Sequence, residues 1–102
     1  MRRSLQVLCP IAENTSFDYE YYFNEHMSIV GGAMSEHIQN TLVTKGIAGG
    51  PGISAGFYAI ATIVFESQVA SDSGMSKAGL ALEDIPNFTN TKPIMLIGEV
   101  VS

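Results

Sequence analysis

Four segments of the chain alternate apolar and polar residues or form short apolar runs, which are the patterns of β-strands. They are residues 4–11, 36–47, 57–66 and 92–101. The third, FYAIATIVFE, is rich in β-branched and aromatic residues. In the second, strict alternation places Ile38, Asn40 and Leu42 on one face. We therefore predict four strands.

Two segments between these strands have helical spacing, residues 17–34 and 67–84. We expect Thr15 to cap the first helix, with Asp18 favourable near its positive end. Gly31 and Gly32 weaken the last turn of that helix and are candidates to end it early.

The second helix is weaker, and its pattern predicts a break near Gly74. Ser67 and Ser76 are its candidate caps. Residues 46–56 hold five glycines and a proline, so they form a loop, read as a connector or lid. The segment 85–90, IPNFTN, has the composition of a turn.

The resulting order is β-α-β-β-α-β, typical of a ferredoxin-like α+β fold with a four-stranded antiparallel sheet. With 102 residues, the chain is expected to form one domain over residues 1–102. There is no internal repeat or low-complexity tract.

Both faces of the predicted sheet are apolar. The segments 57–66 and 92–101 carry apolar side chains on each face, but two helices cover only one side of a sheet. Leaving the other side in water is costly at about 25 cal/mol per Å² of apolar surface. We therefore expect a homodimer with sheet packed against sheet. The alternative is a monomer that tolerates exposed apolar residues.

The composition supports a buried extra face and excludes several partners. Charged residues make up 15% of the chain, below the roughly 25% of an ordinary domain. The net charge is −5 and the five basic residues are scattered, so nucleic-acid binding is not expected. No apolar run is long enough to span a bilayer, and the N-terminus lacks the features of a signal peptide.

The chain has one cysteine, Cys9, which suits a reducing cytoplasm, the expected location. Cys9 alternates with apolar residues and is read as a small core residue rather than a nucleophile.

The first predicted helix carries a histidine within its apolar stripe. An imidazole there needs hydrogen-bond partners, supplied either by the core or by a pocket. The tyrosines of the stripe need partners too, and a histidine titrates near neutral pH, so we favour a pocket for a small apolar molecule. The stripe consists of Tyr19, Tyr22, Phe23, His26, Val30 and Ala33.

Three segments of the sequence resemble the EthD family: FDYEYYFNEHM (17–27), YAIATIVFES (58–67) and LEDIPNFTNTKPIMLIGEV (82–100). The resemblance covers nearly the whole chain in the right order. It implies the dimeric α/β-barrel fold and a role in oxidative catabolism, since the family takes its name from the degradation of ethyl tert-butyl ether.

The resemblance also points to particular residues. The family's helix histidine corresponds to His26 and the aromatic before it to Tyr22. The family's Asp-Ile-x-Asn-Phe-Thr segment corresponds to Asp84, Ile85, Asn87, Phe88 and Thr89. Many members have a proline two residues after the histidine, where this chain has Ser28.

Our leading hypothesis is an enzyme without a cofactor. His26 would be the general acid/base and Tyr22 the donor to a developing oxyanion, in an oxygenation, isomerisation or cyclisation. The candidate ligand-binding residues are Tyr19, Phe23, His37, Asp84 and Phe88.

Several of these residues can also be explained by a structural role alone, without a part in ligand binding. We favour a turn role for Asp84, bonding to backbone N–H groups, over one in which it orients His26 or meets a ligand at the cavity mouth. Phe88 is read as a core plug and His37 as an edge or surface histidine. Two histidines without suitably spaced carboxylates do not predict a metal site.

Two other functions stay open. One is a non-catalytic binding module or accessory protein of an oxygenase pathway, and the other is haem handling with His26 as axial ligand. The sequence shows no nucleotide-binding or cysteine-cluster motif.

Overall fold

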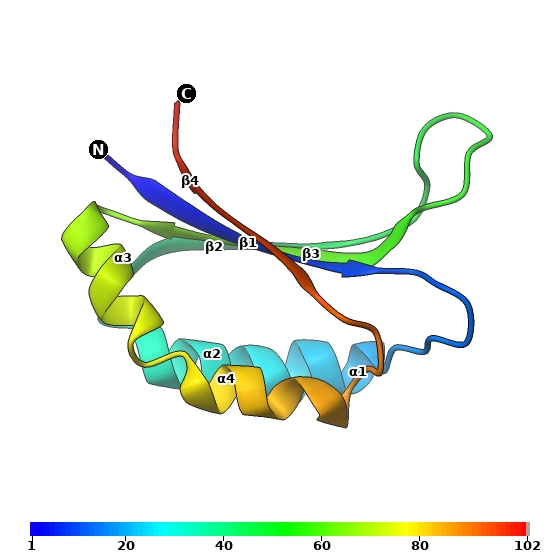
Figure 1. Cartoon of the computed structure of the whole chain (residues 1–102), viewed down its shortest axis with the longest axis horizontal. Helices are drawn as coiled ribbons and strands as arrows, with labels where there is room; N and C mark the ends of the chain where they lie inside the picture. Colours follow the sequence, from blue (N-terminus) through cyan, green and yellow to red (C-terminus); the bar gives the residue numbers. More distant parts are fainter. Residues whose placement is uncertain (102) are drawn as a thin grey trace.

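Four antiparallel strands form a single sheet in the order β2-β3-β1-β4 in the computed structural model, which describes residues 1–101 apart from the side chain of Ala33 (Figure 1). The strands are β1 (Arg3–Pro10), β2 (Ile38–Lys45), β3 (Phe57–Phe65) and β4 (Ile94–Glu99). All four predicted strands are confirmed, with ends that differ from the prediction by at most two residues.

The helices all lie on one side of this sheet (Figure 1). The first helical segment contains α1 (Tyr19–Tyr21), the π-helix η1 (Tyr22–His26) and α2 (Met27–Met34). The second contains α3 (Gln68–Met75), α4 (Gly79–Asp84) and the 3₁₀ turn η2 (Ile85–Asn87). The predicted α+β, ferredoxin-like β-α-β-β-α-β order is confirmed. Within residues 1–101, no helix combines the length and apolar character needed to cross a bilayer.

The first helix begins later than predicted. Its N-cap is Asp18, whose side chain accepts a hydrogen bond from the backbone N–H of Tyr21 at 3.1 Å. The prediction that Thr15 is the cap was wrong, because its hydroxyl bonds to the backbone of Ala12. The two glycines do not end the helix, which continues to Met34.

The second helix is broken where the sequence indicates. Ser67 caps α3 by accepting from the N–H of Ala70 at 3.1 Å, as predicted, and α3 ends one residue after Gly74. Ser76 follows at the C-terminal end of α3 and caps no helix N-terminus. Gly74 packs so closely on the sheet that a Cβ there would lie 2.6 Å from the ring of Phe65.

Strand β2 contains an irregularity that simple alternation does not predict. Its pairing with β3 shifts register between Ile38 and Asn40. Ile38 therefore faces the helices and packs on the core, while Leu42 points to the opposite side of the sheet with 63% of its surface exposed. The prediction that Ile38 and Leu42 share a face was wrong, because a bulge inserts one extra residue between them.

The core lies between the helices and the inner face of the sheet. Alternate residues of β1 and β3 are buried there, among them Leu5, Ala61, Ile63 and Phe65. The outer face is also apolar, as expected. Together with Leu42, it carries Ile94 and Leu96, which are 53% and 57% exposed.

The loop 46–56 extends away from the helices at one end of the sheet (Figure 1). Its tip is a tight turn in which Gly50 and Gly52 have φ values of 144° and 73°, a region that favours glycine. No residue of this loop lines the cavity described below, so it is a connector rather than a cover for that cavity.

Candidate active site

A small cavity of about 50 Å³ lies between the inner face of the sheet and the helices. Strands β1, β3 and β4 supply one wall, with Cys9, Ala61 and Met95 among its residues, and the helices supply the other. The walls are apolar except where Tyr22 and His26 face the space. The arrangement is therefore an apolar hollow with two polar groups at its edge.

The π-helix η1 places His26 against this hollow. Its backbone bond runs from the N–H of Met27 to the carbonyl of Tyr22, five residues back instead of four. Tyr22 and His26 are only 2% and 7% exposed, and their rings stack with centroids 5.5 Å apart. Phe88 approaches the imidazole from another side, with centroids 4.6 Å apart. Aromatic contacts thus fix the ring plane of His26.

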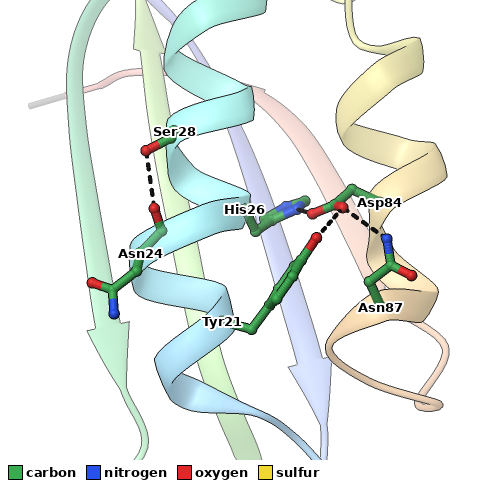
Figure 2. A network of polar contacts seen from close by, with 6 residues as sticks. All are labelled: Tyr21, Asn24, His26, Ser28, Asp84 and Asn87. Carbon is green, nitrogen blue, oxygen red and sulfur yellow. Dashed lines mark hydrogen bonds and ion pairs between the residues drawn. The ribbon is translucent and has the colours of Figure 1, made fainter.

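Asp84, 58 residues further along the chain, fixes one edge of that ring. Its Oδ2 lies 2.9 Å from Nδ1 of His26, and both side chains are buried. Its other oxygen accepts hydrogen bonds from the hydroxyl of Tyr21 at 2.6 Å and from the amide of Asn87 at 3.0 Å. Figure 2 shows the three side chains converging on the carboxylate.

These hydrogen bonds set the charge of Asp84. Burial tends to raise the pKa of its carboxyl group, but the hydrogen bonds from Tyr21, Asn87 and His26 outweigh burial and lower the pKa below 3.8. The group is therefore a carboxylate near neutral pH and can only accept hydrogen bonds. Nδ1 of His26 must then carry the proton, which leaves the lone pair of a neutral imidazole on Nε2.

Nε2 is the atom available for chemistry. Among the described residues, none donates a hydrogen bond to it or accepts one from it. In catalytic Asp–His pairs, the carboxylate holds the proton on one ring nitrogen and the lone pair of the other nitrogen is free to accept a proton. The site can thus accept a proton from a molecule in the cavity.

Tyr22 is the second polar group of the site. Burial raises the pKa of its phenol well above 10, with a further contribution from nearby Cys9. Burial likewise raises the pKa of the Cys9 thiol to about 11. Both groups stay protonated near neutral pH, so Tyr22 can donate a hydrogen bond and Cys9 is no thiolate.

No family model matches the chain, and no curated protein matches it in sequence. In structure it is similar to an EthD-like protein from Ralstonia eutropha, with a TM-score of 0.88 and 30% identity, covering 99% of this chain and 93% of the other. The chain belongs to the EthD family.

Two further structures extend this comparison. An EthD family protein from Bacillus halodurans has a TM-score of 0.78 and 21% identity over 99% of this chain and 100% of its own. A cofactor-independent oxygenase from Streptomyces nogalater has a TM-score of 0.63 at 5% identity, over 99% and 93% of the two chains. At such low identity these two show a common fold.

The structure brings together the residues that correspond to the EthD motifs. His26, Tyr22 and Phe88 line the cavity, and Asp84 bonds to His26 from outside it. The favoured turn reading of Asp84 was wrong: its side chain accepts from three other side chains rather than from backbone N–H groups. Phe88 is 4% exposed and fills the core, which confirms the prediction that it is a core residue.

Three other candidates lie away from the cavity. Phe23 is 40% exposed and lies outside the buried core. Tyr19 donates its hydroxyl to the carbonyl of Tyr58 at 3.3 Å, and Lys45 lies over its ring. His37 is half-buried beside α3 and, like the other two, does not line the cavity.

Ser28 stands where many EthD proteins have proline, and the helix passes through it unbroken. Its hydroxyl donates to the carbonyl of Asn24 at 3.0 Å, one turn back (Figure 2). A bond of this kind competes with the backbone ladder and bends helices slightly. It is made inside the segment that contains the π turn.

Sequence reasoning missed several residues of the site. Tyr21 was not considered because it lies outside the apolar stripe, although it makes the shortest bond to Asp84. Asn87 was predicted as a turn residue and as part of the family motif, without a bond to Asp84. Four methionines of the cavity wall were also missed, although the seven-residue spacing of the two on α2 was a usable signal; they are Met27, Met34, Met75 and Met95.

The described residues offer no obvious metal centre. In the part of the chain that the structure describes, no three His, Cys, Asp or Glu side chains gather as a metal site would require. The cavity of about 50 Å³ also lies well below the roughly 300 Å³ at which pockets for ordinary small molecules begin. It does not fit a haem in this conformation.

Proposed function

We propose that the protein binds a small apolar organic molecule and removes a proton from it, with His26 as general base. The observation that carries this proposal is the bond between Asp84 and His26 at the wall of an apolar cavity. A carboxylate on Nδ1 fixes the tautomer that leaves the lone pair on Nε2, and it holds the ring in place, which is what a general base needs.

Tyr22 has the complementary role in this proposal. When a phenol or a carbonyl compound loses a proton, negative charge develops on its oxygen. Tyr22 keeps its proton because burial raises the pKa of its hydroxyl, so it can donate to that oxygen. The stacked rings of Tyr22 and His26, which both line the cavity, support a donor and a base that act on one ligand.

The reaction we favour is part of oxidative breakdown of small molecules and needs no bound cofactor. Membership of the EthD family and the fold shared with a cofactor-independent oxygenase support this class of chemistry. A deprotonated phenol or enol is electron-rich enough to react with dioxygen directly. Isomerisation or cyclisation would use the same base and the same oxyanion donor.

The test compares wild type with His26→Ala on a panel of small phenols and cyclic ketones, by oxygen uptake and mass spectrometry. We expect wild type to convert at least one compound and the variant to do so about 100- to 10,000-fold more slowly. A variant as active as wild type would contradict the proposal. Binding by wild type without conversion of any compound would favour a non-catalytic accessory module.

We also propose that the protein is a homodimer through the outer face of its sheet. Leu42 and Leu96 are more than half exposed on that face and the helices do not cover it. A second copy placed sheet to sheet would remove this apolar surface from water.

Sedimentation velocity tests the dimer. Wild type is expected to sediment as a dimer and Leu96→Asp as a monomer. Leu80→Asp, which places the same charge at a 66% exposed position on α4, is expected to stay dimeric. A monomeric wild type at high concentration would rule the interface out.

A further inference from the structure

Two of the residues that line the cavity are exposed to solvent. Most of the residues that line it are buried or half-buried, but Leu82 on α4 and Met95 on β4 are 45% and 42% exposed. A side chain that contacts both the cavity and the solvent marks an opening. The opening therefore lies between α4 and β4.

The strand order explains why a gap exists there. β4 is an edge strand, and Met95 and Ile97 pair with Val7 and Leu5, whose side chains face the helices. Residues opposite each other on neighbouring strands share a face, so Met95 and Ile97 belong to the inner face too. Ile97 is nevertheless 59% exposed, which shows that the helices do not cover this edge.

The walls behind this opening are unusually adaptable. Four of the five methionines of the chain line the cavity. Methionine is unbranched and changes rotamer easily, so it fills a space when no ligand is bound and moves aside for one. This matters because an apolar cavity needs about 150 Å³ to accept benzene, and the present one has about 50 Å³.

The lining also limits the charge of a ligand. No lysine or arginine is among the described residues that line the cavity, so no cation would balance an anion there. The apolar surface suits a hydrocarbon ring, and Tyr22 and His26 offer one place for a hydroxyl group.

We infer that a neutral, flat molecule of one or two rings with one acidic hydroxyl enters between α4 and β4, past Leu82 and Met95, and makes room by moving the methionine side chains. The entry route rests on the cavity alone, while the orientation of the hydroxyl toward His26 rests on the proposed function.

Methyl NMR tests the expansion. The full-length protein is labelled with ¹³C at its methionine methyl groups, assigned by single Met→Leu variants, and titrated with 2-naphthol. We expect the signals of Met27, Met34, Met75 and Met95 to shift, while Met1, which is 81% exposed and outside the cavity, stays in place. No shift, or equal shifts of all five signals, would overturn the inference.

The route is tested by blocking it. Leu82→Trp and Met95→Trp are expected to slow 2-naphthol association by about tenfold or more, since an indole fills the gap between α4 and β4. Val69→Trp, at a 75% exposed position on α3 that does not line the cavity, is the control and should bind as wild type does. Circular dichroism checks that all three fold.

These outcomes separate the route from the catalytic proposal, because neither measurement needs turnover. If all three tryptophan variants bind 2-naphthol at the wild-type rate, the route is wrong even if His26 is a base. If only Leu82→Trp and Met95→Trp bind slowly, the route stands even if no reaction is ever found.

Discussion

The two histidines of the chain each have a nitrogen shielded from solvent, but only one of them has a hydrogen-bond partner among the described residues. Nδ1 of His26 meets a carboxylate at 2.9 Å, and its ring is stacked on Tyr22 at the edge of a cavity. Nε2 of His37 is buried with no hydrogen-bond partner in the part of the chain that the structure describes, and His37 does not line that cavity. A histidine becomes a candidate base through its partners rather than through burial.

The largest expected effect comes from breaking the pair at His26. Asp84→Asn keeps the shape of the side chain but lets an amide face Nδ1, which favours the wrong tautomer of the imidazole. We expect turnover to fall by about 1,000- to 10,000-fold, as when an orienting aspartate is neutralised in an Asp–His pair. Kinetics and ¹⁵N NMR of the imidazole measure the two effects.

The control for this change is Glu83→Gln, which removes one negative charge from the neighbouring exposed position. It should leave both the rate and the tautomer as they are. An equal loss of activity in the two variants would mean that net charge, rather than the bond to His26, is what matters.

A second prediction concerns the region around His37, where we expect effects on stability alone. Gly74→Ala puts a methyl group 2.6 Å from the buried ring of Phe65, so the packing of α3 on the sheet must shift. We expect a loss of about 1–3 kcal/mol in the free energy of unfolding, measured in urea, with unchanged turnover of the folded protein.

Gly79→Ala is the matched control, because a Cβ there meets nothing within 4 Å. It should leave stability unchanged or raise it slightly, since alanine is the better helix former. If both variants lose the same stability, close packing at Gly74 is not the cause.

A third prediction uses the low pKa of Asp84. The folded protein holds this carboxyl group ionised to lower pH than the unfolded chain, whose value is near 3.8. Its contribution to stability is therefore fully present above the unfolded pKa and is lost as pH falls through the folded pKa. Tyr21→Phe removes the 2.6 Å hydrogen bond and raises the folded pKa, so less of this contribution exists at any pH.

Urea unfolding of wild type and Tyr21→Phe, from neutral pH down to about pH 3, measures this difference. The gap in stability between the two proteins should be widest at neutral pH and should narrow as the medium becomes acidic. A gap that does not change with pH would show that Tyr21 acts by packing only.

The smallest effect is expected at His37 itself. His37→Phe keeps a ring of similar shape and removes a buried nitrogen that has no partner among residues 1–101. Exchanging an unsatisfied polar group for an apolar one is nearly neutral or stabilising, so we expect a change under about 1 kcal/mol and normal turnover. A large loss of activity would place His37 in the site after all.

The arrangement of elements could be read from the sequence because it depends on local patterns. The alternation of apolar and polar residues predicted the strands. The run from Phe57 to Phe65 is rich in β-branched and aromatic residues, which favour a strand. The bulge before Asn40 could not be found, because a register shift is decided by the partner strand.

The site was only partly predictable, for a geometric reason. In a regular α-helix, Tyr21 and His26 lie about 140° apart, so they are assigned to different faces. The π turn between Tyr22 and His26 brings residues five apart closer to one face, and both then reach Asp84. Nothing local to the helix marks that turn, and Asp84 lies 58 residues away.

The buried thiol of Cys9, which lines the cavity, provides a chemical probe of how often the protein opens. Cys9 is 1% exposed, it is the sole cysteine of the chain, and its pKa is raised to about 11. Alkylating reagents attack the thiolate, so the native protein should resist iodoacetamide until the cavity widens or the sheet opens around Cys9. The alkylation rate then reports how often each molecule opens, and a ligand that tightens the fold should slow it.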